Sequence, residues 1–339
     1  MSIGIRITLA GAVVAAVGLA LTFDKPVVET VQLGYRGTGM QQVVNPARFE
    51  AAVAASKVPD AIPPVPPGGE KASVAYKNVK VLTEISADEL ARTMVAITEW
   101  VSPEQGCAYC HKDGEDLSED TLYTKVVARR MLEMTRQING KWQAHVGGTG
   151  VTCFTCHRGQ PVPAFVWHAD PGPRQALGAA GSRAGQNAPA AGVGLTSLPY
   201  DPLSQYLRGK DGNIRVVSAT ALPESNRTSI KQTEGTYGLM MHLSEALGVN
   251  CTFCHNSQSF TAWDKSSPRR ATAWQGIQMV RELNDAFLEP LGPTYPKDRL
   301  GPHGDAPKAN CATCHQGAYK PLFGASMLKD HPELVGPRR

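Results

Sequence analysis

Four copies of the pattern Cys-x-x-Cys-His contain all eight cysteines of the 339-residue chain. This spacing lets two thiols add to the two vinyl groups of one haem, while the histidine that follows reaches the iron as an axial ligand. We therefore predict four covalently attached haems. The first motif has Cys107, Cys110 and His111, the second Cys153, Cys156 and His157, the third Cys251, Cys254 and His255, and the fourth Cys311, Cys314 and His315.

Other chemistries use a Cys-x-x-Cys pair, namely a zinc half-site, a thioredoxin-type redox pair or a short disulfide. In this chain a histidine follows the second cysteine all four times, although the chain has only nine histidines. Zinc sites do not require that histidine, and redox pairs do not repeat four times. The pattern therefore indicates a tetrahaem c-type cytochrome.

The composition fits a chain built around haem. Aromatic residues make up only 6% of the sequence, as expected if porphyrin supplies much of the core, and 25 prolines with 33 glycines predict much irregular chain. The net charge of +4 is offset by the carboxylates of the haems, so it does not indicate nucleic acid as a partner. Haem is attached outside the reducing cytoplasm, which places the mature protein in the periplasm.

An apolar stretch without charge covers residues 7–23, between Arg6 and Asp24. A bilayer core requires about 20 apolar residues, with a range that reaches down to roughly 17. We therefore expect residues 1–23 to form an N-terminal transmembrane helix, kept as a membrane anchor or uncleaved signal rather than removed as a signal peptide. Arg6 then holds the N-terminus in the cytoplasm, with the rest of the chain on the periplasmic face of the inner membrane.

The remaining chain is expected to be mainly α with much irregular structure. A capping box at Ser86 and Glu89 predicts a helix that ends at Ser102. Further helices are predicted at about 120–138, closed by Asn139-Gly140, at about 234–247 and at about 272–287. The predicted segments are an extended segment over 24–85, a first haem pair over 86–165, a Gly/Pro/Ala-rich connector over 166–230, a second haem pair over 231–325 and a C-terminal tail over 326–339.

The two haem-pair units are related by an internal repeat. Met94-Val-Ala-Ile-Thr-Glu-Trp-Val matches Met240-Met-His-Leu-Ser-Glu-Ala-Leu, and Met134-Thr-Arg-Gln-Ile-Asn matches Met279-Val-Arg-Glu-Leu-Asn. Each unit is therefore predicted to run helix, motif, helix, motif.

The sixth iron ligands decide whether the irons pass electrons or bind substrate. A methionine on an apolar helical face is by default core filler. Met94 and Met240, however, hold matching places upstream of the first and third motifs, which favours both as ligands.

The ligands of the other two haems stay open from the repeat alone. Met131 and Met134 share a helix face, and their counterparts in the second unit are Gly276 and Met279. If Met134 were the ligand of the second haem, Met279 would serve the fourth equally. If it is Met131, the fourth haem needs another ligand, which His145 or His303 could supply.

Several long segments resemble the tetrahaem cytochrome c subunit of purple bacterial photosynthetic reaction centres. The resemblance covers most of residues 30–335, although several relatives carry a lipidated N-terminal cysteine that this chain lacks. The matching segments, besides the four motifs, are Gly34-Tyr-Arg-Gly-Thr-Gly-Met40, Met94-Val-Ala-Ile-Thr-Glu-Trp-Val-Ser-Pro-Glu-Gln-Gly-Cys107, Val151-Thr-Cys-Phe-Thr-Cys-His-Arg-Gly-Gln-Pro161 and Pro321-Leu-Phe-Gly-Ala-Ser-Met-Leu328.

The resemblance implies the sixth ligands. Met94 matches the family ligand of the first haem, Met131 that of the second and Met240 that of the third. His145 matches the residue that reaches across to the fourth haem, which would give that haem two histidine ligands. With every iron saturated, the resemblance implies an electron carrier, and a multihaem reductase is the alternative that would need an open iron.

The resemblance also implies the partners. The family arranges its haems in the order first, second, fourth, third, with the third nearest the bacteriochlorophyll special pair of the L and M subunits. A soluble periplasmic donor, either a small cytochrome c or a high-potential iron–sulfur protein, would dock at the far end. The chain would then re-reduce the photo-oxidised special pair, whereas service to a respiratory complex is the alternative.

Overall fold

The computed structural model describes residues 3–22, 28–32, 41–169, 201–209, 212–216 and 228–336, together with residues 193, 196, 198 and 199. The segment Gly34–Met40 that contributes to the resemblance lies outside the described residues, as do most of the predicted connector and residues 337–339 of the predicted tail.

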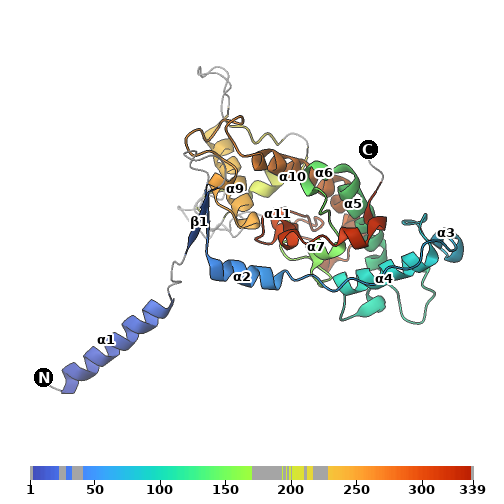
Figure 1. The fold of residues 1–339 in the computed structure, drawn as a ribbon, viewed down its shortest axis with the longest axis horizontal. Helices are drawn as coiled ribbons and strands as arrows, with labels where there is room; N and C mark the ends of the chain where they lie inside the picture. The colour runs from blue at the N-terminus through green and yellow to red at the C-terminus, as the bar shows by residue number, and fades with distance from the viewer. Residues whose placement is uncertain are drawn as a thin grey trace.

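The described chain is mainly helical with much irregular structure, which confirms that part of the predicted fold class. Figure 1 shows α3 and α4 at one end of the molecule and α9 with β1 at the other, with α7 and α11 between them. The main helices are α4 (Ala87–Val101), α5 (Tyr123–Lys141), α7 (Cys153–His157), α9 (Ile230–Leu247), α10 (Arg269–Leu283) and α11 (Cys311–His315).

Short helical elements connect these helices. The π-helix η6 (Asn284–Leu288) continues α10, and a 3-10 helix, η7 (Glu289–Thr294), follows it. The others are η1 (Gly106–Tyr109), α6 (Gln143–Val146), α8 (Pro202–Tyr206), η5 (Cys251–Phe253), η8 (Lys297–Arg299), η9 (Pro321–Gly324), η10 (Leu328–Asp330) and η11 (Pro332–Leu334).

The helix before the first motif begins and ends where the sequence predicts. Ser86 Oγ accepts a hydrogen bond from the Glu89 backbone N–H at 3.1 Å, so the predicted N-cap of α4 is present. The corresponding helix of the second unit, α9, begins at a capping box of Ser229 and Gln232 and ends at Gly248 in the left-handed conformation.

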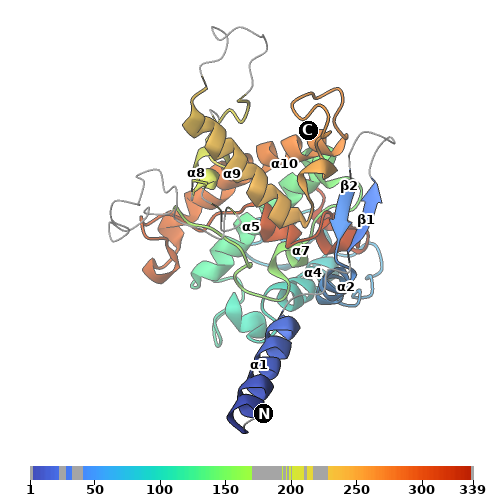
Figure 2. The ribbon, with the colours of Figure 1, turned by 90° about the vertical axis from the view of Figure 1, so that its left-hand side faces the viewer.

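The N-terminal helix α1 (Ile3–Thr22) stands apart from the rest of the molecule in both views (Figures 1 and 2). Among the described residues, no helix combines the length and the apolar character that crossing a bilayer requires, so the predicted N-terminal transmembrane helix is wrong.

The segment before the first unit is not extended throughout. Strands β1 (Glu29–Gln32) and β2 (Gln41–Val44) form an antiparallel pair in which Glu29 lies opposite Val44. Asn45 then caps α2 (Pro46–Ala55), with a proline at its first position, and α3 (Ala72–Ala75) follows. Residues 57–69 between these helices contain no regular element and hold the proline cluster.

The buried apolar residues form two clusters, one that joins the two units and one in the first unit. One lies where α5, α9 and α10 meet, and the other lies around α4. The first contains Ile138, Tyr206, Leu239, Ile277 and Val280, and the second contains Leu90, Ala96, Trp100, Leu132 and Leu334.

The C-terminal segment is part of the first unit rather than a free tail. Leu334 is fully buried in the cluster around α4, and the Gly336 N–H donates to the Arg136 carbonyl of α5 at 3.1 Å. Residues 334–336 therefore pack against the helix that precedes the second motif.

Two equivalent asparagines position the second and fourth motifs. Asn139 donates to the Val151 carbonyl at 2.9 Å and accepts from the Val151 N–H at 2.8 Å. Asn284 makes the same pair of bonds with Ala309, at 3.0 and 2.9 Å. Val151 and Ala309 each lie two residues before a motif's first cysteine, so each side chain fixes the backbone on which a motif begins.

The role of Asn139 corrects the predicted end of the second helix. Asn139-Gly140 was expected to close the helix, but α5 continues to Lys141. The Asn139 amide is 3% exposed and also donates to the Leu334 carbonyl at 2.9 Å. The side chain is therefore satisfied by distant backbone groups and does not compete with the helix.

We predict that Asn139→Ala and Asn284→Ala each lower the free energy of unfolding by about 3 kcal/mol, because each change removes three buried hydrogen bonds. Guanidinium-induced unfolding of the haem-loaded protein measures this. The control is Gln143→Ala, at an exposed helical position, which should change stability by about 0.5 kcal/mol or less. Losses of similar size at all three positions would contradict the positioning role of the asparagines.

Candidate haem-binding sites

The four motifs adopt two local forms, one at the start and one at the end of each unit. The first and third motifs lie on 3-10 helices, η1 and η5, whereas the second and fourth form the short α-helices α7 and α11. Thr152 and Asn310 cap these two α-helices, each in a capping box with a threonine three residues on. The repeat is therefore visible in local structure as well as in sequence.

Both motif helices end in the same way. Arg158 and Gln316 adopt left-handed backbone conformations, with φ of 51° and 48°, directly after the motif histidine. The next residue is a glycine in each case, whose N–H donates at 2.8 Å to a carbonyl near the end of the unit's first helix, Trp100 in α4 or Ala246 in α9. Helices α4 and α9 thus hold α7 and α11 through equivalent bonds.

Each motif histidine is oriented by its Nδ1 atom. A metal-ligating histidine usually bonds its second ring nitrogen to a carbonyl or carboxylate, which fixes the ring. All four motif histidines have such a partner, which leaves Nε2 as the nitrogen for an iron. The Nδ1 partners are Leu117 O at 3.0 Å from His111, Gln160 O at 2.8 Å from His157, Phe260 O at 2.8 Å from His255 and Ala318 O at 2.9 Å from His315.

Burial favours the neutral form of the histidine and cysteine side chains at the second and fourth motifs. It lowers the pKa of His145, His157 and His315, the last to about 4, and neutral imidazole is the form that binds metal. Burial also raises the pKa of the Cys153 and Cys311 thiols to about 12, so both are protonated at neutral pH.

The second and fourth motifs lie against each other. Helix α7 packs on α11, and Gln316 Nε2 donates to the Cys156 carbonyl at 3.3 Å. The Cα atoms of Cys156 and Cys314 are 4.3 Å apart, and the structure joins these residues in a disulfide. A sulfur in a disulfide cannot form a thioether to haem, so the two bonds are alternatives. The other six cysteines are free thiols.

His145 has the features of a second axial ligand opposite His315. Its Nδ1 lies 2.9 Å from the Thr272 carbonyl, the same arrangement as in the motif histidines. Its ring centre lies 6.0 Å from that of His315. Two imidazoles bonded to one metal at about 2 Å each have ring centres separated by roughly this distance. By contrast, His303 lies on an exposed loop.

Gly276 provides the space that His145 occupies. A Cβ atom on Gly276 would lie 2.5 Å from His145 Cε1 and 2.9 Å from Nδ1, closer than real contacts allow. In the repeat, Gly276 is the counterpart of Met131. Because the second unit has Gly276 where the first has Met131, it lacks that methionine and has room for the His145 ring.

The methionines fall into two groups. Met94, Met131 and Met240 are half-buried, on α4, α5 and α9 respectively. Met279 is 8% exposed inside the cluster between α5, α9 and α10, which makes it a core residue. Met134 is half-buried as well, and it packs against the same cluster as Met240. Burial therefore does not separate Met131 from Met134, and the choice between them stays a prediction.

Unpaired buried donors fit the carboxylates that every haem carries. Within the described ranges, five buried nitrogen atoms have no hydrogen-bond partner, and leaving such a donor unpaired costs about 1–3 kcal/mol. They are Trp142 Nε1, Arg158 Nη2, His168 Nε2, Arg208 Nε and His242 Nε2. The cysteines, the oriented histidines and these donors together fit the haem group.

A buried lysine fixes the loop before the fourth motif. The Lys308 side chain is fully buried, where it pairs with Asp305, donates to the Ala306 carbonyl at 2.9 Å and lies 3.5 Å from Glu289 Oε1. Its ammonium also sits 4.8 Å from the ring centre of Trp167, and the two backbones exchange hydrogen bonds. The spacing of charged residues in the sequence gave no sign of this cluster.

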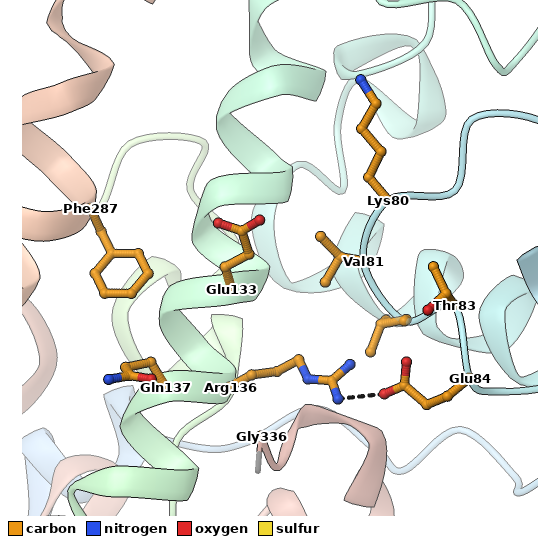
Figure 3. Close-up of a pocket in the computed structure, with 10 residues that line it drawn as sticks. Lys80, Val81, Thr83, Glu84, Glu133, Arg136, Gln137, Phe287 and Gly336 are labelled. Carbon is orange, nitrogen blue, oxygen red and sulfur yellow. Dashed lines mark hydrogen bonds and ion pairs between the residues drawn. The ribbon is translucent and has the colours of Figure 1, made fainter. Parts of the chain in front are cut away.

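A cavity of about 360 Å³ lies beside α5, between this helix and the segment around Glu84 (Figure 3). Its lining includes Glu84 and Arg136, which form an ion pair, and none of its lining residues belongs to a motif. Partial burial acts to raise the pKa of Glu84, but the hydrogen bonds from Arg136, Thr83 and the backbone, together with the charge of Arg136, outweigh it and the pKa is lowered. The cavity is therefore not a haem site.

Repeated thiol pairs with oriented histidines define a c-type cytochrome. The family model described as "Photosynthetic reaction centre cytochrome C subunit" matches residues 24–335. The chain therefore belongs to the family of photosynthetic reaction-centre cytochrome c subunits.

Three relatives carry the name photosynthetic reaction center cytochrome c subunit. That of Rubrivivax gelatinosus is 51% identical, over 98% of this chain and 91% of the relative. That of Thermochromatium tepidum is 46% identical, over 98% of this chain and 82% of the relative. That of Roseobacter denitrificans is 43% identical, over 90% of this chain and 85% of the relative.

Membership of this family confirms several predictions at a coarse level. The chain is an electron carrier of photosynthesis and not an enzyme, it carries covalently bound c-type haem, and it is a component of the reaction-centre complex.

We predict that Lys308→Ala lowers the free energy of unfolding by about 3–5 kcal/mol, because the largely buried Asp305 keeps its charge without its lysine partner, whereas Glu289 retains its ion pair with Arg208. Thermal or guanidinium unfolding measures the loss. The matched control is Lys141→Ala. This change removes the ion pair between Lys141 and Glu282, whose charged atoms lie 2.6 Å apart. The Lys141 side chain is 42% exposed, so the loss should be about 1 kcal/mol or less. Equal losses in the two variants would contradict a structural role for the buried lysine.

Proposed function

We propose that this chain re-reduces the photo-oxidised bacteriochlorophyll special pair with electrons from a soluble periplasmic donor, a small cytochrome c or a high-potential iron–sulfur protein. The observation that carries the proposal is the contact of α7 with α11, which brings haem motifs from the two units together. A chain with four attachment sites can conduct only if neighbouring sites are close, and this contact joins the two halves of the path.

The proposed order of the haems is first, second, fourth, third. Packing of α4 on α7, of α7 on α11 and of α11 on α9 supports this order. The first and third motifs then lie at the ends of the line, in agreement with the positions of α4 and α9 in Figure 1. The third would face the special pair, and the first would receive the donor.

The proposed ligands complete four six-coordinate irons. Met94, Met131 and Met240 serve the first, second and third haems, and His145 serves the fourth. The Nδ1 bond of His145, its distance from His315 and the space at Gly276 support the last assignment. Cys156 and Cys314 are assigned to haem attachment, because their motifs share the oriented histidine of the other two.

Each group in the chain has a simple task in this scheme. Haem supplies a one-electron carrier whose potential depends on its axial ligands and surroundings. The cysteines fix position, the backbone carbonyls fix the histidine rings, and the apolar clusters exclude water. The proposed location is the periplasmic face of the photosynthetic inner membrane, in contact with the L and M subunits.

Flash spectroscopy on membranes that contain the complex tests the function. After a flash that bleaches the special pair, a haem of this chain should be oxidised as the special pair recovers, and added soluble donor should re-reduce it. If the special pair recovers without oxidation of any haem of this chain, the proposed function is wrong.

We predict that His145→Ala makes one haem of four high-spin or raises its potential, because it loses its second histidine ligand. Gly276→Ala should disturb the same haem, since the added methyl group collides with the imidazole. Alanine otherwise favours the helix by about 1 kcal/mol over glycine, so the fold is retained. Redox titration with electron paramagnetic resonance (EPR) measures both, and changes in two different haems would contradict the assignment.

A second pair of variants separates the two methionines of α5. Met131→Leu should remove a ligand from the second haem and make it high-spin. Met134→Leu should leave all four haem spectra unchanged and alter stability by less than about 1.5 kcal/mol, because the two side chains have similar volume. Absorption and EPR spectra of the oxidised protein decide between them, and the reverse result would show that Met134 is the ligand.

A further inference from the structure

The third motif differs from the other three in the residue that accepts from its histidine. The Phe260 ring lies flat on the imidazole of His255, with ring centres 4.2 Å apart and planes 4° from parallel. The carbonyl of the same residue is the Nδ1 partner of His255 at 2.8 Å. Among the described residues, no aromatic ring stacks in parallel on the other motif histidines; the His145–His315 pair meets at 68°.

The stack lies at the surface. Phe260 is 43% exposed, so its ring is the cover between the His255 imidazole and solvent. At the other end of the line, Leu117 holds the comparable place beside His111 and is 66% exposed, but it offers no flat aromatic face. Ala318, the partner of His315, is 2% exposed. Aromatic cover thus occurs at only one of the two outer motifs.

A hydrogen bond and a parallel stack constrain the imidazole in complementary ways. The Nδ1 bond fixes the direction of the ring nitrogens but leaves some freedom to rotate about that axis. A flat ring held against one face removes the rotation and keeps water from that face. Orientation of the ligand ring and access of water both affect the potential of an attached haem.

We propose that Phe260 is a positioning residue that fixes the rotation of the His255 ring and shields it from water, and so sets the potential of the haem at the third motif. The inference rests on the proposed function, in which this haem passes its electron directly to the special pair. The Phe260 side chain would then adjust the electron transfer from the third haem to the special pair.

Three substitutions of Phe260 test the proposal, since all keep the backbone carbonyl. In Phe260→Ala, water reaches the imidazole and stabilises the more highly charged oxidised state, so the potential of the third haem should fall and its EPR signal should shift. Phe260→Leu retains apolar cover without a flat face and should shift the EPR signal with a smaller fall in potential. Phe260→Tyr keeps the flat aromatic ring, so the potential and the EPR signal of the third haem should stay close to those of the unchanged protein. The readouts are a haem-resolved redox titration and the EPR spectrum of the oxidised protein.

The matched control is Trp263→Leu. Trp263 is 49% exposed in the same loop, but its ring lies against Arg270, 4.2 Å from the guanidinium carbon, and not on His255. This variant should leave the potential and EPR signal of the third haem unchanged. The haem is identified as the one whose signal changes in Met240→His, where its methionine ligand is replaced.

Two results would overturn the proposal. One is an unchanged potential and EPR signal of the third haem in Phe260→Ala and Phe260→Leu. The other is a change in Trp263→Leu as large as that in Phe260→Ala. Flash oxidation of the same membranes keeps the two claims apart. If no haem is oxidised by the flash but Phe260→Ala still shifts one haem, the positioning role stands and the proposed function fails.

Discussion

Two haem motifs from opposite halves of the chain pack directly against each other, and the rest of the structure is arranged to make that contact. Helices α7 and α11 meet with the Cα atoms of Cys156 and Cys314 4.3 Å apart. Helices α4 and α9 hold these two helices from outside through equivalent hydrogen bonds from Gly159 and Gly317. In the proposed scheme of four haems, this contact is what joins the two haem pairs into one path.

The chain positions its functional groups mainly through backbone carbonyls and buried amides. Each motif histidine has a carbonyl at its Nδ1 atom, and so does His145. Asn139 and Asn284 each hold both backbone groups of a residue two positions before a motif. Such bonds fix a ring or a backbone without adding a charge beside the iron. Lys308, a fully buried charge near the fourth motif, is paired with acidic side chains.

Local sequence patterns predicted the motifs and several helices, whereas the sixth ligands of the irons stay predictions. The motifs, the capped helix α4 and the repeat follow from local spacing, so they were accessible. Asn139 was taken as a helix end, because Asn-Gly usually is one and its distant partner cannot be seen locally, although its match with Asn284 was a usable signal. Gly276 was noticed as a missing methionine, but its contact with His145 depends on tertiary packing. The predicted membrane-spanning helix was wrong, since no helix among the described residues is long and apolar enough to cross a bilayer.

The central claim is that all eight cysteines attach haem, including the two whose backbones touch. The most direct test is mass spectrometry of the intact mature chain, followed by peptide mapping without reduction. The account predicts the mass of the polypeptide plus four haems, with Cys156 and Cys314 each in a haem-bearing peptide. A mass with fewer than four haems, or a peptide in which Cys156 and Cys314 remain joined as a disulfide, would contradict it.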